Sequence, residues 1–223
     1  MLFMNSSTMF PPLSRHPSAA LSTSIQTAKL AACLLLAVAA AGSARAALIK
    51  FDELPTQTLN GISLQGVAFK FELSGAVSTD ATFNSIALGA NTTLNLQSPT
   101  AEGNASGVLT LDFAQPVSLL SFDVARLTSI TLPGATVSLF DSALAGFATT
   151  PVTISNLATF SEGKFSYVGS TPVKRAVVTF NAGAGPRFSI DNLAFTPVPE
   201  PGTMLAGVLL TGVCACARQR RRR

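Results

Sequence analysis

The chain has 223 residues, a formal net charge of +4, one histidine, three cysteines and no tryptophan. The histidine (His16) and the cysteines (Cys33, Cys214 and Cys216) lie near the two ends of the sequence, which excludes Ser-His and Cys-His catalysis, histidine-bound zinc and disulfide bonds in between. Residues 47–202 have seven basic and eleven acidic side chains, a net charge of 7 − 11 = −4, and this excludes the basic groove that nucleic-acid binding requires.

Residues 1–46 have the organisation of a secretory signal peptide with a long amino-terminal region. Lys29 precedes an apolar run over 30–42, and Ala44-Arg45-Ala46 places small residues at both positions that signal peptidase reads before a cut. We therefore expect export through the secretion machinery and cleavage between Ala46 and Ala47.

Residues 47–197 are predicted to form one all-β domain, since about 150 residues suffice for a single hydrophobic core. Apolar and polar residues alternate, as where Leu109 and Leu111 flank Thr110, and this period of two indicates half-buried strands of an antiparallel sheet. No comparable helical pattern occurs in this region. The expected strands are 48–54, 67–73, 82–88, 92–97, 108–113, 118–125, 136–140, 152–160, 164–168, 173–181 and 187–195.

The connections between these strands favour an antiparallel two-sheet β-sandwich with jelly-roll topology as the first choice. Gln115-Pro116 separates two strands that either form a hairpin or cross between sheets, and Leu132-Pro133-Gly134 is predicted to be a turn. Thirteen phenylalanines after Ala46 predict a phenylalanine-rich core between the two sheets.

Three segments resemble galactose-binding-like jelly rolls, the class that includes carbohydrate-binding modules. They are an opening Ile49-Lys50-Phe51-Asp52-Glu53-Leu54, a middle 108–113, and a closing Phe188-Ser189-Ile190-Asp191-Asn192-Leu193-Ala194-Phe195. The resemblance implies that acidic residues on the first and last strands hold a structural calcium ion, with Asp52, Glu53 and Asp191 as candidates. Calcium prefers carboxylate and carbonyl oxygens, but solvated strand ends commonly carry Asp as well.

Two alternatives to a purely structural domain remain open. A carbohydrate-binding module would be indicated by a groove that exposes Tyr167 or several phenylalanine rings. A carboxylate-dependent hydrolase would need two acids about 5 to 9.5 Å apart across a cleft. No catalytic residue is assigned, and no cofactor is expected other than the calcium named above.

Residues 198–223 are predicted to be an address rather than a part of the fold. Two prolines forbid regular helix in the first segment, Val198-Pro199-Glu200-Pro201-Gly202-Thr203, which we expect to be extended. The uncharged stretch 203–217 would form a short transmembrane helix, at about 1.5 Å per residue shorter than a hydrocarbon core of roughly 30 Å. The basic residues that follow favour a cytoplasmic end and are Arg218, Arg220, Arg221, Arg222 and Arg223.

This tail resembles the PEP-CTERM sorting domain of exported proteins in exopolysaccharide-producing Gram-negative bacteria. Pro199-Glu200-Pro201 matches the tripeptide that defines the family, and the helix and the basic cluster follow it in the expected order. The resemblance implies that exosortase, a membrane-embedded processing enzyme, recognises and removes the tail. An ordinary single-span anchor with a proline-containing linker is the alternative.

Together these features predict an exported, non-enzymatic protein that is anchored in the inner membrane and then processed to the cell surface or extracellular matrix. Its expected role is structural or adhesive within the exopolysaccharide layer.

Overall fold

The computed structural model describes residues 45–86, 96–97, 99–128, 130–157 and 160–198. Within these residues every strand pairing is antiparallel, and the only helical element is one 3-10 turn. The all-β antiparallel prediction is therefore confirmed. The elements are β1 (Ala47–Ile49), β2 (Gln57–Thr58), β3 (Ser63–Leu64), β4 (Val67–Leu73), β5 (Ala76–Val77), β6 (Thr82–Ser85), β7 (Thr100–Asn104), β8 (Gly107–Arg126), β9 (Leu132–Phe140), β10 (Gly146–Leu157), β11 (Phe160–Phe180), η2 (Ala182–Ala184) and β12 (Arg187–Pro197).

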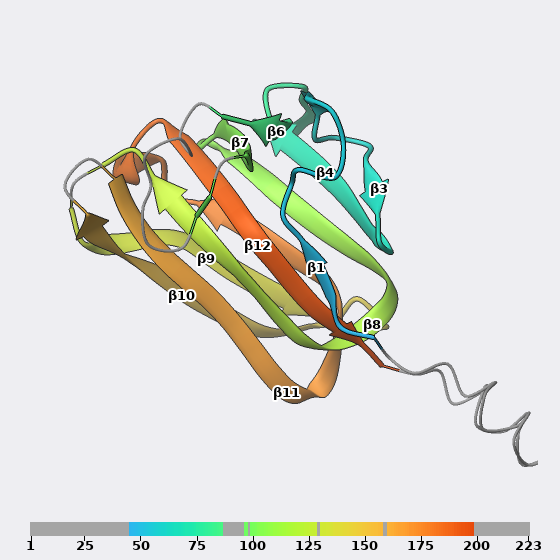
Figure 1. Ribbon diagram of the computed structural model, residues 1–223. Helices are drawn as coiled ribbons and strands as arrows, with labels where there is room; N and C mark the ends of the chain where they lie inside the picture. The colour runs from blue at the N-terminus through green and yellow to red at the C-terminus, as the bar shows by residue number, and fades with distance from the viewer. Residues whose placement is uncertain (1–44, 87–95, 98, 129, 158–159, 199–223) are drawn as a thin grey trace, which may run out of the picture. The chain divides into compact units, whose positions relative to one another are not determined.

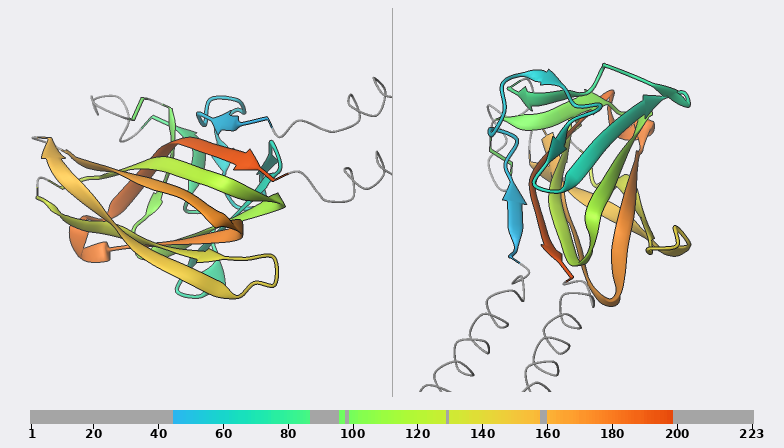
Figure 2. Two further views of the ribbon diagram at one scale, coloured as in Figure 1. Left: turned by 90° about the horizontal axis from the view of Figure 1, so that it is seen from below. Right: turned by 90° about the vertical axis from the view of Figure 1, so that its right-hand side faces the viewer.

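Two long strands, β8 and β11, pass from one layer of the fold into the other (Figure 1). The first layer has the order β10–β9–β11–β8–β4 and uses the early part of β8 and the late part of β11. The second layer pairs the early part of β11 with the late part of β8, and then β8 with β12. Figure 2 shows the two layers edge-on.

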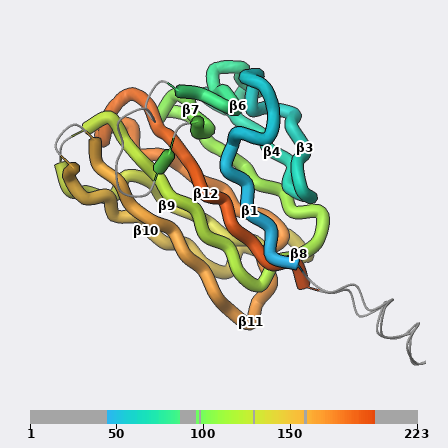
Figure 3. Tube along the Cα trace, in the orientation of Figure 1, coloured from blue at the N-terminus to red at the C-terminus, as the bar shows by residue number. Residues whose placement is uncertain are grey.

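The far edge of β12 is shared by two strands that are distant in sequence. β7 pairs with Arg187–Ile190, and β1 pairs with Leu193–Phe195, so the first and last strands lie side by side (Figure 3). β6 and β2 extend the sheet beyond β7.

Phenylalanine rings from both layers meet in the core, as the composition predicts. Phe188 of β12 stacks on Phe180 of β11 with ring centroids 3.7 Å apart, and Phe113 of β8 lies 5.4 Å from Phe195 of β12. All described phenylalanines are buried except Phe140 and Phe147, which are half-buried. Burial of these rings on both inner faces, together with Leu, Ile and Val side chains, stabilises the fold.

Several predicted boundaries are wrong at the two proline-containing connections. Gln115-Pro116 lies inside β8 at the point where the strand changes layer, so the crossing alternative is correct and the hairpin is not. Leu132-Pro133-Gly134 starts β9 instead of forming a turn. Pro133 is tolerated there because it lies beside a register shift of the β9–β10 pair, where a missing N–H costs little.

The opening strand is also shorter than predicted. β1 ends at Ile49, because Phe51 has φ +61° and turns the chain so that its ring packs against Phe69 and Phe83. Predicted strand residues 92–95 lie outside the described residues.

Candidate functional site

Three charged side chains form a row across the outer face of the second layer. Lys164 of β11 is the register partner of Asp123 of β8, which is in turn the partner of Asp191 of β12. The alternation of β8 places Phe122 and Val124 in the core and therefore Asp123 on the outer face. Yet Asp123 is only 3% exposed and Asp191 only 2%, so the outer face is covered at this point.

A bulge in β12 organises the polar contacts of this row. The register between β12 and β8 shifts after Asp191, and Asn192 there has φ +52°. The Asn192 amide group donates a hydrogen bond to Asp123 Oδ2 at 3.0 Å, and its backbone N–H donates to Asp191 Oδ1 at 2.6 Å. Gln97 donates its backbone N–H to Asp191 Oδ2 at 2.9 Å, which ties a distant segment over the acids.

The carboxyl groups of Asp123 and Asp191 differ in how many of their oxygens accept a hydrogen bond. Asp123 Oδ1 is buried without a hydrogen-bond partner and lies 3.9 Å from the ammonium group of Lys164. The pKa of Asp191 is raised from 3.8 to about 6, chiefly by burial and also by the charges of Asp123 and Asp52, while the hydrogen bonds from two backbone N–H groups lower it. The Asp191 carboxyl group therefore changes its protonation in a mildly acidic range.

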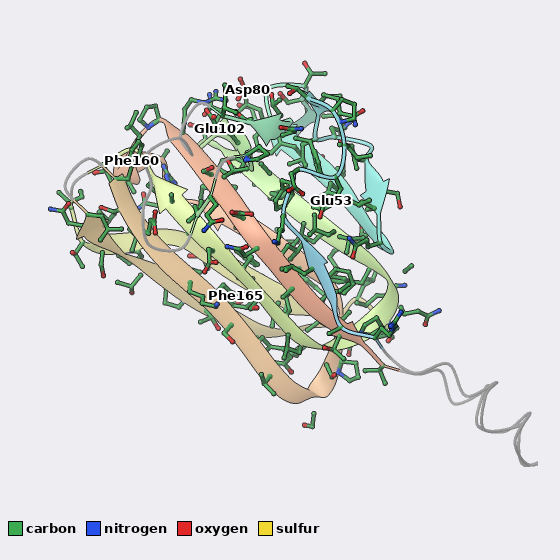
Figure 4. All side chains as sticks on the ribbon, in the orientation of Figure 1. Glu53, Asp80, Glu102, Phe160 and Phe165 are labelled. Atoms are coloured by element: carbon green, nitrogen blue, oxygen red, sulfur yellow. The ribbon has the colours of Figure 1, made fainter. Side chains whose placement is uncertain are left out.

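The three calcium candidates are arranged unevenly. Asp52 is exposed and close enough to Asp191 for its charge to affect the pKa of that group. Glu53 instead accepts the backbone N–H of Lys50 at 2.8 Å and closes its own turn; Figure 4 labels it on the β1 side. In the described ranges no group of three or more His, Cys, Asp or Glu residues is placed to hold a metal ion. The calcium assignment stays a prediction.

Other acids of the domain serve ion pairs between strands. Arg187 of β12 contacts Glu102 and Asp80, which Figure 4 labels at the same end of the domain. Arg175 of β11 donates two hydrogen bonds to Asp112 of β8 on the outer face of the first layer. The acids that do face each other, Asp123 and Asp191, are too buried for a substrate to reach, which argues against the hydrolase alternative.

Arg126, at the end of β8, was not singled out by the sequence reasoning. Its side chain is fully buried, and its guanidinium donates to the carbonyl oxygens of Arg187, Gly134, Asn181 and Gly185. Burial lowers its pKa to about 10, so it stays charged at neutral pH. One cation thus holds together the start of β9, the turn around η2 and the start of β12.

Among the described residues, the aromatic side chains are buried or half-buried and do not form the exposed platform that the sugar-binding alternative requires. Tyr167 is half-buried, donates its hydroxyl to the Thr171 carbonyl at 2.8 Å and packs its ring against Phe147 at 5.9 Å. The remaining candidate is Phe140, which lies in register beside Arg175 on the outer face of the first layer.

The targeting residues lie mostly outside the described part of the chain. This holds for Ala44, for Pro199 to Thr203 and for the arginines from Arg218 to Arg223. Ala47 opens β1, and Val198 donates its backbone N–H to the carbonyl of Pro116 at 2.7 Å. Among the described residues no helix is long and apolar enough to span a membrane. The predicted span 203–217 is not among them.

Comparison with known proteins gives structural neighbours only. No family model matches the chain, and no curated protein matches it. A family 29 carbohydrate-binding module is 14% identical, with 68% of this chain and 89% of that chain covered and a TM-score of 0.36. A family 29 module from Piromyces equi is 10% identical, with 69% and 91% covered and a TM-score of 0.39.

A third solved structure contains the N-terminal CBM22-1 and GH10 modules of xylanase 10B from Clostridium thermocellum in complex with xylohexaose. It is 11% identical, with 68% of this chain and 28% of that chain covered and a TM-score of 0.39. All three TM-scores lie below 0.5, so the fold and the site rest on the strand pairing and contacts described above.

Proposed function

We propose that this chain is an exported, non-enzymatic β-sandwich protein that exosortase processes and releases to the cell surface or the exopolysaccharide layer, where it has a structural or adhesive role. The observation on which the proposal depends is the predicted sorting motif, which starts at Val198 immediately after a domain whose last strand ends at Pro197. Signal peptidase would generate the amino terminus at Ala47, the first residue of β1.

The chemistry of the described domain supports a non-catalytic role. Its central carboxyl pair is buried, its Arg175–Asp112 and Arg187–Glu102 pairs join strands, and its sequence contains neither histidine nor cysteine. A protein with these features contributes a stable surface instead of a reaction centre. Calcium on Asp52 and Asp191, two of the three predicted ligands, belongs to the same proposal as a structural ion and is tested below.

The processing step is tested with Glu200→Gln in cells that contain a functional exosortase. Full-length precursor should accumulate in the inner membrane, because the central residue of the motif is altered. Glu53→Gln, at an exposed acid of the domain, is the matched control and should be processed normally. Normal release of the Glu200→Gln protein would contradict the proposal.

The second candidate function is binding of exopolysaccharide by a jelly-roll module, and one surface of the domain favours it. On the outer face of the first layer the row Asp112–Arg175–Phe140 puts a half-buried ion pair in register with an aromatic residue, next to the hydroxyl-bearing Ser138 and Thr149. Fixed hydrogen-bonding groups beside a ring are what recognition of a sugar requires.

This candidate is tested by affinity electrophoresis of residues 47–198 through gels that contain the exopolysaccharide. Retardation should be lost in Arg175→Met and kept in Arg187→Met, whose ion pair is with Glu102. Equal mobility with and without the polysaccharide would exclude sugar binding at this face.

A further inference from the structure

The outer face of the second layer has an uncharged patch at the end where β12 finishes. Two register rows form it: Val168–Leu119–Thr196 across β11, β8 and β12, and Ser121–Ala194–Leu48 across β8, β12 and β1. Their chain neighbours Leu120 and Phe195 are in the core, so by alternation these six side chains face outward. We call them the β12-end patch.

The patch has the character of an interaction surface. Val168 is 76% exposed and Leu48 is 43% exposed, and the other four residues are half-buried. The next row along the strands begins with Lys164, whose side chain is 60% exposed, whereas the acids of that row are buried. The patch is therefore flat, apolar and hydroxyl-bearing, with an exposed positive charge on its border.

The short segment between β12 and the apolar stretch limits the distance between the domain and that stretch. Val198 is hydrogen-bonded to Pro116, and the apolar stretch begins at Met204, 204 − 198 = 6 residues later. Six fully extended residues span at most roughly 20 Å. The 11 residues of β12 extend about 36 Å at ~3.3 Å each, so the tether is shorter than the domain.

We propose that the β12-end patch rests on the phospholipid headgroups of the membrane while the tail is still attached. This rests on the proposed function, because it requires residues 203–217 to be in the bilayer. Leu48 and Val168 supply apolar contact at the interface, and Lys164 pairs with anionic headgroups. Removal of the tail leaves too little contact for lasting attachment, so processing releases the domain.

The test uses residues 47–223, the chain that remains after the predicted signal-peptidase cleavage, with Cys214 and Cys216 replaced by serine. The protein is reconstituted in vesicles of phosphatidylethanolamine and phosphatidylglycerol that contain a nitroxide-labelled headgroup. A fluorophore is attached at Val168→Cys or, as the matched control, at Val77→Cys. Val77 is 60% exposed and pairs with Glu72 in β5–β4, at the end of the first layer near Gly107. Quenching should be several-fold stronger at residue 168 than at residue 77.

A second pair of variants separates patch contact from mere tethering. Ser166→Glu adds a carboxylate to the exposed register partner of Ser121 and should reduce quenching at residue 168 to the control level, whereas Ser63→Glu in β3 should not. Equal quenching at residues 168 and 77, or no effect of Ser166→Glu, would overturn the placement. Excimer formation by pyrene at residue 168 without lipid quenching would assign the patch to a second copy and likewise overturn it.

Flotation of the vesicles distinguishes this failure from failure of the proposed function. Protein that floats with the vesicles but shows equal quenching disproves only the patch contact. Protein that does not float disproves the membrane role of the tail and the patch contact with it.

Discussion

Strand β8 contains two buried charges, Asp123 and Arg126, that are satisfied in opposite ways. The Arg126 guanidinium donates hydrogen bonds to four backbone carbonyl groups, and none of these hydrogen bonds goes to a carboxylate. Asp123 has one bound oxygen and one without a hydrogen bond, and its neighbour across the sheet is another acid. The cation is surrounded by carbonyl dipoles and stays charged at neutral pH, whereas Asp191 of the acid pair gains a proton in the mildly acidic range.

Asp123 and Arg126, three residues apart at the end of β8, therefore have different tasks. The Arg126 cluster fixes loops that enclose the core, and its energy should vary little with conditions. The Asp123–Asp191 pair is the place where the solution composition can act on the stability of the domain.

The largest expected effect is that of Arg126→Met in residues 47–198. Removing the guanidinium takes one donor away from each of four carbonyl groups, of which Gly134 and Asn181 keep a backbone N–H donor. We expect a loss of about 3–5 kcal/mol in the free energy of unfolding. Arg175→Met is the matched control and should cost at most about 1 kcal/mol, because its ion pair with Asp112 is partly exposed. Urea unfolding measures both; equal losses would remove the distinction between the two arginines.

The next effect concerns the dependence of stability on pH. Because the pKa of Asp191 is raised in the folded state, from 3.8 to about 6, its proton stabilises the fold below pH 4 and this stabilisation is lost as the pH rises through 6. The shift corresponds to about 2–3 kcal/mol. Asp191→Asn should flatten the profile over this range and raise stability at pH 7 relative to the unmodified protein. An unchanged slope in the variant would contradict the assignment.

Calcium that binds as the predicted structural ion should stabilise the folded domain through Asp191. At a concentration one hundredfold above its dissociation constant, an ion bound only to the folded state adds about 2.7 kcal/mol. The melting temperature at pH 7 should rise with calcium in the unmodified protein but not in Asp191→Asn. It should also rise in Glu53→Gln, because the Glu53 carboxylate already accepts a hydrogen bond from the backbone N–H of Lys50. A calcium response that survives Asp191→Asn would place the ion elsewhere.

The smallest expected effect is a shift in the titration midpoint of the Asp191 carboxyl group. Asp123→Asn removes a neighbouring negative charge, which should lower the pKa of Asp191 by a fraction of the total shift, since burial is the larger cause. Carbon-13 NMR of the Asp191 carboxyl group measures the midpoint. No displacement would mean that the two acids do not interact.

The sequence was sufficient to predict the inner faces of the fold. Alternation of Leu, Val and Phe depends on neighbouring residues only, and it correctly predicted antiparallel strands with a phenylalanine core. Local pattern did not predict that the strands on either side of Gln115-Pro116 are one continuous β8, because a change of layer is decided by partners such as Val198 and Gly66.

The polar cluster could be predicted only in part, for a related reason. Asp191 is marked in the sequence by its place in the closing strand. The burial of Asp123 and Asp191 depends on distant contacts such as that of Gln97, which lies 94 residues from Asp191 in the chain and which local pattern does not predict. Arg126 has no carboxylate or spacing to mark it, since its acceptors are backbone carbonyls of remote turns.

The central claim, that the domain is released from a membrane-anchored precursor, is tested most directly by intact mass spectrometry of membrane and extracellular fractions from cells with and without exosortase. The account predicts an extracellular product that starts at Ala47 and lacks the apolar stretch and the arginines, and its absence when the enzyme is absent. An uncleaved tail in the membrane of both strains would contradict the account and leave residues 198–223 as a simple anchor.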